Sequence, residues 1–103
     1  MSLTDRLEGL LAAGKENAPL RVSLAQAAMG RGDARDAITH LEQAVKLDPD
    51  YTAAWKAYGR ALAMEGHDEE ARKAYRRGLE VARSAGDRQA TREIGVFLRR
   101  LDK

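Results

Sequence analysis

The feature that most constrains the fold of this chain is an internal repeat, in which the sequence resembles itself at an offset of 34 residues. The positions that recur are Leu24 and Tyr58, Ala25 and Gly59, Ala27 and Ala61, Ala28 and Leu62, Gly32 and Gly66, Ala37 and Ala71, Leu41 and Tyr75, and Ala44 and Gly78. A period of this length is typical of stacked helical hairpins, because one hairpin cannot bury its apolar face without a neighbour. The repeat therefore predicts an all-α fold built from antiparallel helical pairs.

Capping residues and helix breakers divide each repeat into two helices. Asn17 and Asp33 are suitable N-caps for the two helices of the first pair. Asp48-Pro49 ends that pair, because proline cannot continue a helix. The second pair has no proline at its end, so its last helix is expected to continue until Gly86. The four helices are expected at about 17–30, 34–47, 52–64 and 68–85.

These residues resemble the tetratricopeptide repeat, a helix-turn-helix of about 34 residues with Trp, Leu, Gly, Tyr, Ala and Pro at characteristic positions. The first copy, 17–50, matches through Leu24, Ala25, Ala28, Gly32, Ala37, Leu41, Ala44 and Pro49. The second copy, 51–86, matches through Trp55, Tyr58, Gly59, Leu62, Gly66, Ala71, Tyr75 and Gly78. Arg21 replaces the expected Trp in the first copy, and Arg83 replaces the expected Pro in the second. The resemblance implies one domain over 1–103, a short right-handed superhelix of about six helices.

The segments that flank the two repeats are also expected to be helical. Subtracting 34 residues from the apolar positions of the 34–47 helix reaches Leu3, Leu7, Leu10 and Leu11. Residues 1–16 are therefore expected to form the second helix of a preceding half repeat. At the other end the same shift fails, because it places Gln89, Arg92 and Glu93 at core positions. Residues 87–103 are expected to form an amphipathic capping helix outside the repeat register.

The resemblance also implies where a partner would bind, since the first helix of each hairpin lines a concave surface in this family. The matching lining residues are Val22, Gln26, Met29, Lys56, Arg60 and Met64. Lys56 and Arg60 lie four residues apart and share one helix face, where two cations can hold a carboxylate. We therefore expect an interaction module or adaptor that binds a peptide segment or helix of another protein, with acidic character favoured. The alternative for these two residues is an ordinary solvated helix face.

The charge distribution leaves two further functions open. Residues 1–70 contain 8 Lys and Arg against 12 Asp and Glu, whereas residues 71–103 contain 10 against 4. Because position along a repeat stack follows position along the sequence, the two ends are expected to differ in charge. The alternatives are a scaffold that self-assembles through these ends and a nonspecific binder of polyanions or nucleic acid through the basic C-terminal region. A monomer is favoured over self-assembly, because the last helix is amphipathic and not apolar on its exposed side. A protein partner is favoured over nucleic acid, because the basic region has no aromatic platform for bases beyond Tyr75.

No residue pattern indicates catalysis, a metal site or a cofactor. The chain has no cysteine, and its two histidines, His40 and His67, belong to no metal-binding spacing. There is no G-x-S-x-G sequence and no phosphate-binding glycine loop followed by lysine. The sequence also has no basic leader with an apolar core and no apolar run approaching ~18 residues. We therefore expect a cytoplasmic, non-enzymatic protein with no membrane contact.

Overall fold

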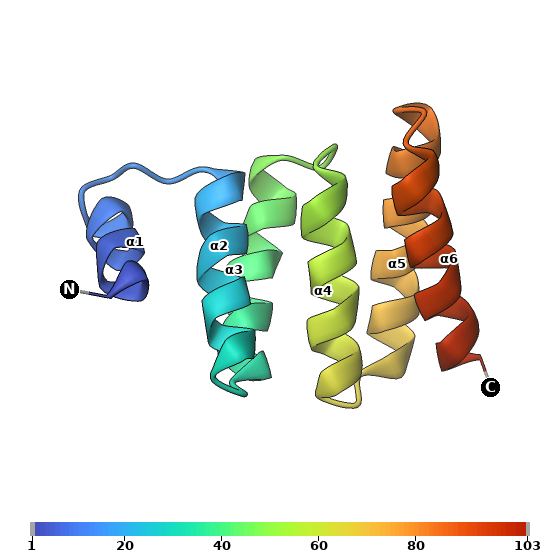
Figure 1. Cartoon of the computed structure of the whole chain (residues 1–103), viewed down its shortest axis with the longest axis horizontal. Helices are drawn as coiled ribbons and strands as arrows, with labels where there is room; N and C mark the ends of the chain where they lie inside the picture. Colours follow the sequence, from blue (N-terminus) through green and yellow to red (C-terminus); the bar gives the residue numbers. More distant parts are fainter. Residues whose placement is uncertain (1, 103) are drawn as a thin grey trace.

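The computed structural model describes residues 2–102, which form six α-helices and no strand (Figure 1). The helices are α1 (Leu3–Ala12), α2 (Ala18–Gly30), α3 (Ala34–Leu47), α4 (Thr52–Met64), α5 (Asp68–Ser84) and α6 (Arg88–Leu101). The four helices of the two repeats lie within one residue of the predicted bounds. The prediction of an all-α fold is therefore confirmed.

Four of the helices begin at residues whose side chains cap them: Ser2 for α1, Asn17 for α2, Asp33 for α3 and Asp87 for α6. The side-chain oxygen of Asn17 accepts a hydrogen bond from the backbone N–H of Leu20 at 2.8 Å. Asp33 caps α3 in the same way, and Asp87 accepts from the backbone N–H of Ala90 at 3.0 Å. Each cap satisfies an amide that the helix itself leaves unpaired. The helix starts predicted from Asn17 and Asp33 are thus explained by local hydrogen bonds.

The helices form two layers of stacked hairpins. In Figure 1, α2, α4 and α6 lie in the front layer, and α3 and α5 lie behind them. The helix α2 packs on α3, and α4 packs on α5, while α3 also contacts α4 and α5 also contacts α6. The tight turns that join the helices of each hairpin make them antiparallel. At the turn after α4, Gly66 has a φ of 78°, a conformation that favours glycine.

The core between the layers is built from small residues and a few large ones. Several alanines are fully buried, including Ala25, Ala37, Ala61 and Ala71. The closest approach is at Gly59, where an added Cβ would lie 2.4 Å from Cε1 of Tyr75. Trp55 lies at the edge of the same core, and its indole N–H donates to the carbonyl of Pro49 at 2.7 Å. Small residues therefore allow the helices of one hairpin to approach closely.

The helix α6 follows the repeat with a shift of 36 residues instead of 34. Without a proline at its end, α5 has 17 residues against the 14 of α3. The next turn is one residue shorter, so α6 begins two residues later than the period predicts. With this shift, Ala54, Tyr58, Gly59 and Leu62 of α4 correspond to Ala90, Ile94, Gly95 and Leu98 of α6. The expected capping helix thus lies where the first helix of a third hairpin belongs.

The helix α1 is attached to the rest of the fold only weakly. It contacts α2 and no other helix, and none of its residues is buried. Leu3 and Leu10 are 66% and 47% exposed. Among the described residues, no first helix of its own hairpin precedes α1, so one apolar side of this helix has no partner.

Candidate functional site

The six predicted groove residues differ in accessibility. Val22 is only 4% exposed and belongs to the apolar core around α2 and α4, so its side chain is not available to a partner. Met29 is partly buried and packs against the same core. Gln26 and Arg60 are exposed, and Met64 is 56% exposed. Apart from Lys56, the accessible residues of the predicted surface are therefore Gln26 on α2 and Arg60 and Met64 on α4.

Lys56 is engaged in an ion pair that the sequence analysis missed. Its ammonium donates to Oε2 of Glu93 on α6 at 2.8 Å. The hydrogen bond from Lys56, with a further one from Gln89, holds the pKa of the Glu93 carboxyl below its usual range. Lys56 therefore joins α4 to α6 and is not a free cation for a ligand.

Arg60 instead belongs to a cluster of aromatic and basic side chains at the far end of α4. Its guanidinium lies 5.7 Å from the centroid of the Phe97 ring, and that of Arg100 lies 5.9 Å from the same centroid. Tyr75 stacks on Phe97 with 5.7 Å between centroids and 14° between planes. Neither arginine forms an ion pair within residues 2–102. Two cations without an ion-pair partner in the described residues thus lie against one aromatic ring.

These side chains border an open hollow that we call the Arg60–Arg100 pocket. It has a volume of about 250 Å³ and is lined by Arg60, Ala63, Met64, Tyr75, Phe97, Arg100 and Leu101. Burial raises the pKa of Tyr75 to about 12, although the nearby Arg60 acts in the opposite direction. The tyrosine is therefore neutral at physiological pH. The pocket combines an apolar floor with two guanidinium groups that can pair with an anion.

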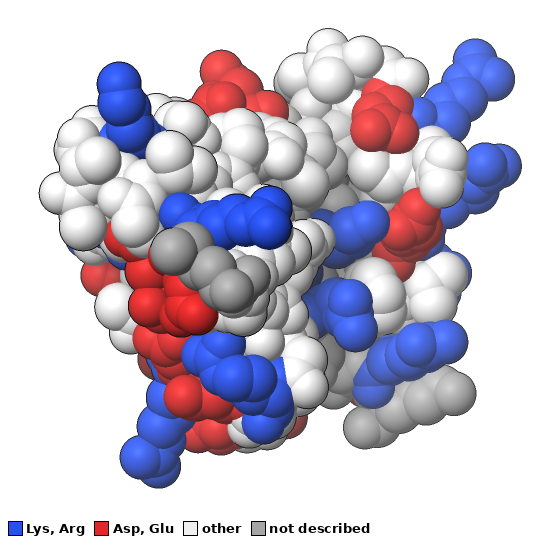
Figure 2. All heavy atoms as spheres, turned by 60° about the vertical axis from the view of Figure 1, so that its left-hand side comes forward, with Lys and Arg blue, Asp and Glu red and all other residues white. Residues whose placement is uncertain are grey.

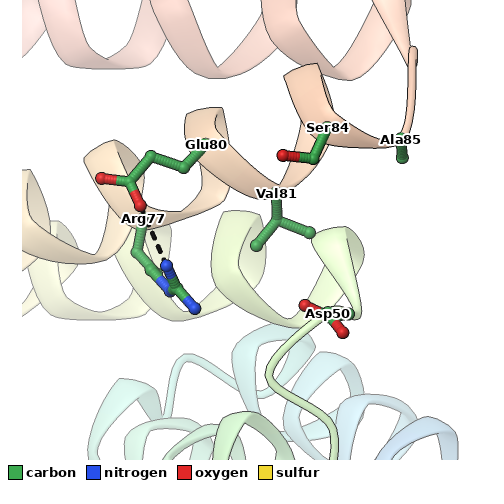
Figure 3. A pocket seen from close by; sticks show the side chains of 6 residues that line it. All are labelled: Asp50, Arg77, Glu80, Val81, Ser84 and Ala85. Carbon is green, nitrogen blue, oxygen red and sulfur yellow. Dashed lines mark hydrogen bonds and ion pairs between the residues drawn. The ribbon is translucent and has the colours of Figure 1, made fainter.

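A second hollow lies beside the C-terminal half of α5 and is different in character. It measures about 400 Å³ and is lined by Asp50, Arg77, Glu80, Val81, Ser84 and Ala85 (Figure 3). Figure 3 shows Arg77 and Glu80 pointing toward each other, and they form an ion pair of 2.9 Å. The single cation of this hollow is thus already neutralised, in contrast to Arg60 and Arg100.

The ion pair between Lys56 and Glu93 gives a testable pH dependence. Because the pKa of Glu93 is lowered in the folded state, its contribution to stability is present above the ordinary carboxyl pKa and is lost as pH falls through the lowered value. In a Lys56→Met variant, we expect the pKa of Glu93 to rise toward its ordinary value. An NMR titration of the Glu93 side-chain carboxyl measures this shift directly. A Lys46→Met variant, which removes the exposed pair with Glu42, serves as the matched control, and a Glu93 pKa unchanged by Lys56→Met contradicts the assignment.

Within residues 2–102, no three His, Cys, Asp or Glu side chains are grouped so that they could hold a metal ion. No helix in this part of the chain is both long enough and apolar enough to cross a membrane.

Stacked antiparallel hairpins with an accessible face of first helices define a helical-repeat protein of the kind that binds other proteins. Residues 22–88 match the tetratricopeptide repeat family model, and the chain belongs to this family. It is 43% identical over 101 residues to a TPR repeat-containing protein of Pseudomonas aeruginosa, an alignment that covers 98% of this chain and 96% of that protein.

Two solved structures are also similar to this chain. The solution structure of a Bordetella parapertussis protein superposes with a TM-score of 0.84 at 40% identity, covering 99% of this chain and 89% of that one. The crystal structure of a tetratricopeptide repeat domain protein of Salinibacter ruber gives a TM-score of 0.79 at 26% identity, covering 84% and 97%. The predicted family is therefore confirmed.

Proposed function

We propose that the protein is an adaptor that binds an acidic segment of another protein, and that the Arg60–Arg100 pocket is the centre of this contact. The observation that carries the proposal is the pair of guanidinium groups, both close to Phe97 and both without an ion-pair partner in the described part of the chain. The family supports the general class, since tetratricopeptide repeats serve protein–protein interaction.

The chemistry of the pocket suggests what such a segment contains. The two arginines favour a carboxylate, which each guanidinium can hold through charge-assisted hydrogen bonds. Next to them, Met64 is 56% exposed and offers a flexible apolar surface. A ligand with an acidic residue adjacent to an apolar one fits both features. Gln26 on α2 lies on the same layer and provides an uncharged polar contact beyond the pocket.

A crosslinking experiment in cells tests this proposal. A photoreactive phenylalanine analogue is placed at Met64, and the crosslinked partner peptide is identified by mass spectrometry. The Arg60→Glu, Arg100→Glu double variant is expected to lose most of this crosslink, because the pocket becomes acidic and repels a carboxylate. Circular dichroism confirms that the variant remains helical.

The matched control changes the same amount of charge on the other layer. Lys73 and Arg76 are exposed on α5 and have no ion-pair partner within residues 2–102, so a Lys73→Glu, Arg76→Glu variant is expected to retain the crosslink. Equal loss in both variants indicates binding governed by overall charge, as for a polyanion, and overturns the proposal. Retention of the crosslink in the Arg60, Arg100 variant overturns it as well.

A further inference from the structure

The α6 helix has a half-buried face that borders a hollow, and we call it the α6 outer face. It consists of Thr91, Gly95 and Leu98, and together with Leu79 of α5 it borders a hollow of about 490 Å³. With the shift of 36 residues, these three residues correspond to Trp55, Gly59 and Leu62 of α4. On α4, these positions face the second helix of the hairpin, because Gly59 lies against Tyr75, and Trp55 lies 3.0 Å from an added Cβ at Gly78.

No second helix packs against Gly95 among the described residues. An added Cβ at Gly59 would collide with the Tyr75 ring, whereas at Gly95 the nearest atom is Nη1 of Arg99 at 3.6 Å. Val96, the neighbour of Gly95, is 36% exposed. Within residues 2–102, α6 is thus a first helix without the second helix that completes a hairpin.

The α1 helix has the complementary defect. Its residues Leu3, Leu7 and Leu10, which we call the α1 leucine stripe, lie 68 residues before Ala71, Tyr75 and Gly78. In α5, Tyr75 and Gly78 contact the first helix of their own hairpin, at Gly59 and Trp55. In α1 no such helix is present among the described residues, which explains the exposure of Leu3 and Leu10.

From these two open faces we propose that the protein assembles head to tail, with the α1 leucine stripe of one copy seated on the α6 outer face of another. The side-chain sizes match at the levels of Gly95 and Thr91. Leu7 would meet Gly95, as Tyr75 meets Gly59 in the second hairpin. The equivalent residues of the first hairpin, Leu41 and Ala25, share one buried core. Leu10 would meet Thr91. In the second hairpin the equivalent pair is the small Gly78 with the large Trp55, so a larger residue on one side is balanced by a smaller one on the other. In this assembly α1 keeps its contact with α2 of its own copy while it also contacts α6 of the other copy. The helix α5 is placed in the same way, because it contacts both α4 and α6.

Charge favours the same pairing. The hollow at the α6 outer face is bordered by Arg83, Arg92 and Arg99, which are exposed and have no ion-pair partner within residues 2–102. On α1, Asp5 and Glu8 outnumber Arg6. In the face drawn in Figure 2, Asp and Glu are concentrated toward the left, on the side of the earlier helices, whereas Lys and Arg occur on both sides and predominate at the right, on the side of the C-terminal helices. Docking therefore brings surfaces of opposite charge together.

The geometry of this contact predicts the form of the assembly. A head-to-tail contact uses a different surface on each copy, so it does not stop at a dimer unless a ring closes. Because one ten-residue helix provides the α1 side, the interface is at the small end of specific interfaces, and we expect association only at concentrations on the order of 100 µM. Sedimentation velocity is expected to show a series of species that grows with protein concentration and shrinks with added salt.

Two variants that each block one end provide the decisive test. Leu3→Glu with Leu10→Glu places charge on the α1 leucine stripe, and Gly95→Glu fills the α6 outer face. Each variant alone is expected to be monomeric at about 1 mM, whereas an equimolar mixture is expected to form dimers and nothing larger, since it contains one intact end of each kind. Two single substitutions are matched controls that should still give the series of species. Gly95→Ala is tolerated because alanine stands at the equivalent position, Ala25, of the first hairpin. Gly9→Glu is tolerated because an added Cβ at Gly9 meets nothing within 4 Å.

Three outcomes overturn the proposal. The first is a monomer at about 1 mM for the unmodified chain. The second is association of either blocked variant alone, which indicates contacts between like ends. The third is a mixture that stays monomeric while each variant has the circular dichroism spectrum of the unmodified chain. None of these experiments alters Arg60 or Arg100, so their result is independent of the proposed binding pocket.

Discussion

A Gly59→Leu variant is expected to lose about 3 kcal/mol of its free energy of unfolding, or more. The reason is steric, because a Cβ alone at this position lies 2.4 Å from Cε1 and 2.5 Å from Cδ1 of Tyr75. Tyr75 is only 2% exposed and is stacked on Phe97, so it has little room to move. Urea denaturation followed by circular dichroism measures the change. A midpoint equal to that of the unmodified chain contradicts the close packing of α4 on α5.

The matched control is the equivalent position of α6. Gly95 has the same repeat position as Gly59, but an added Cβ meets only Nη1 of Arg99 at an ordinary contact distance of 3.6 Å. The free energy of unfolding of a Gly95→Ala variant is therefore expected to rise by about 0.5–1 kcal/mol, since alanine is more favourable than glycine in a helix interior. Opposite signs at these two glycines separate the steric effect from helix propensity. Destabilisation by Gly95→Ala contradicts the ordinary contact distance at that position.

An Ile94→Ala variant is expected to lose about 2–5 kcal/mol, through lost burial and the cavity that remains. Ile94 is fully buried and belongs to the cluster that includes Leu62, Ala74 and Tyr75. Its Cδ1 lies 3.2 Å from an added Cβ at Gly78, so it fixes α6 against α5. Denaturation measures the total loss. Hydrogen exchange is expected to show that the amides of α6 lose protection before those of α2 and α3, because a repeat stack is stabilised by neighbours.

A substitution on the exposed side of α6 is the control for this effect. Val96 is 36% exposed, so a Val96→Ala variant loses little burial and is expected to remain within about 0.5 kcal/mol of the unmodified chain. Equal losses at Ile94 and Val96 contradict the packing of α6, because they imply that its two sides are equally buried.

The two hairpins could be predicted closely from the sequence because their signals are local and repeated. Asn17 and Asp33 cap helices by hydrogen bonds to residues three positions away, and the glycine turns need no distant contacts. The 34-residue period then places the apolar positions of each helix relative to its neighbours. Even the extension of α5 followed from a local feature, the absence of proline at Arg83.

The accessible surface was less predictable, because it depends on the position of α6. The same extension of α5 displaces α6 by two residues, so a strict 34-residue period assigned Glu93 to the core and gave Phe97 and Arg100 no place in the groove. A shift of 36 residues pairs Gly59 with Gly95. This match was the sequence signal that could have placed Phe97 and Arg100 beside the groove. The burial of Val22 was not encoded in the period at all, since it results from how α2 and α4 approach each other.

The contacts of this fold also determine how the chain reaches it. Each helix contacts only helices one or two places away along the chain, and no contact joins the first helices to the last. Native pairs are therefore close in sequence, and the entropy lost in bringing them together is small. We expect folding within microseconds to milliseconds, beginning in either complete hairpin and spreading outward, with α1 ordering last.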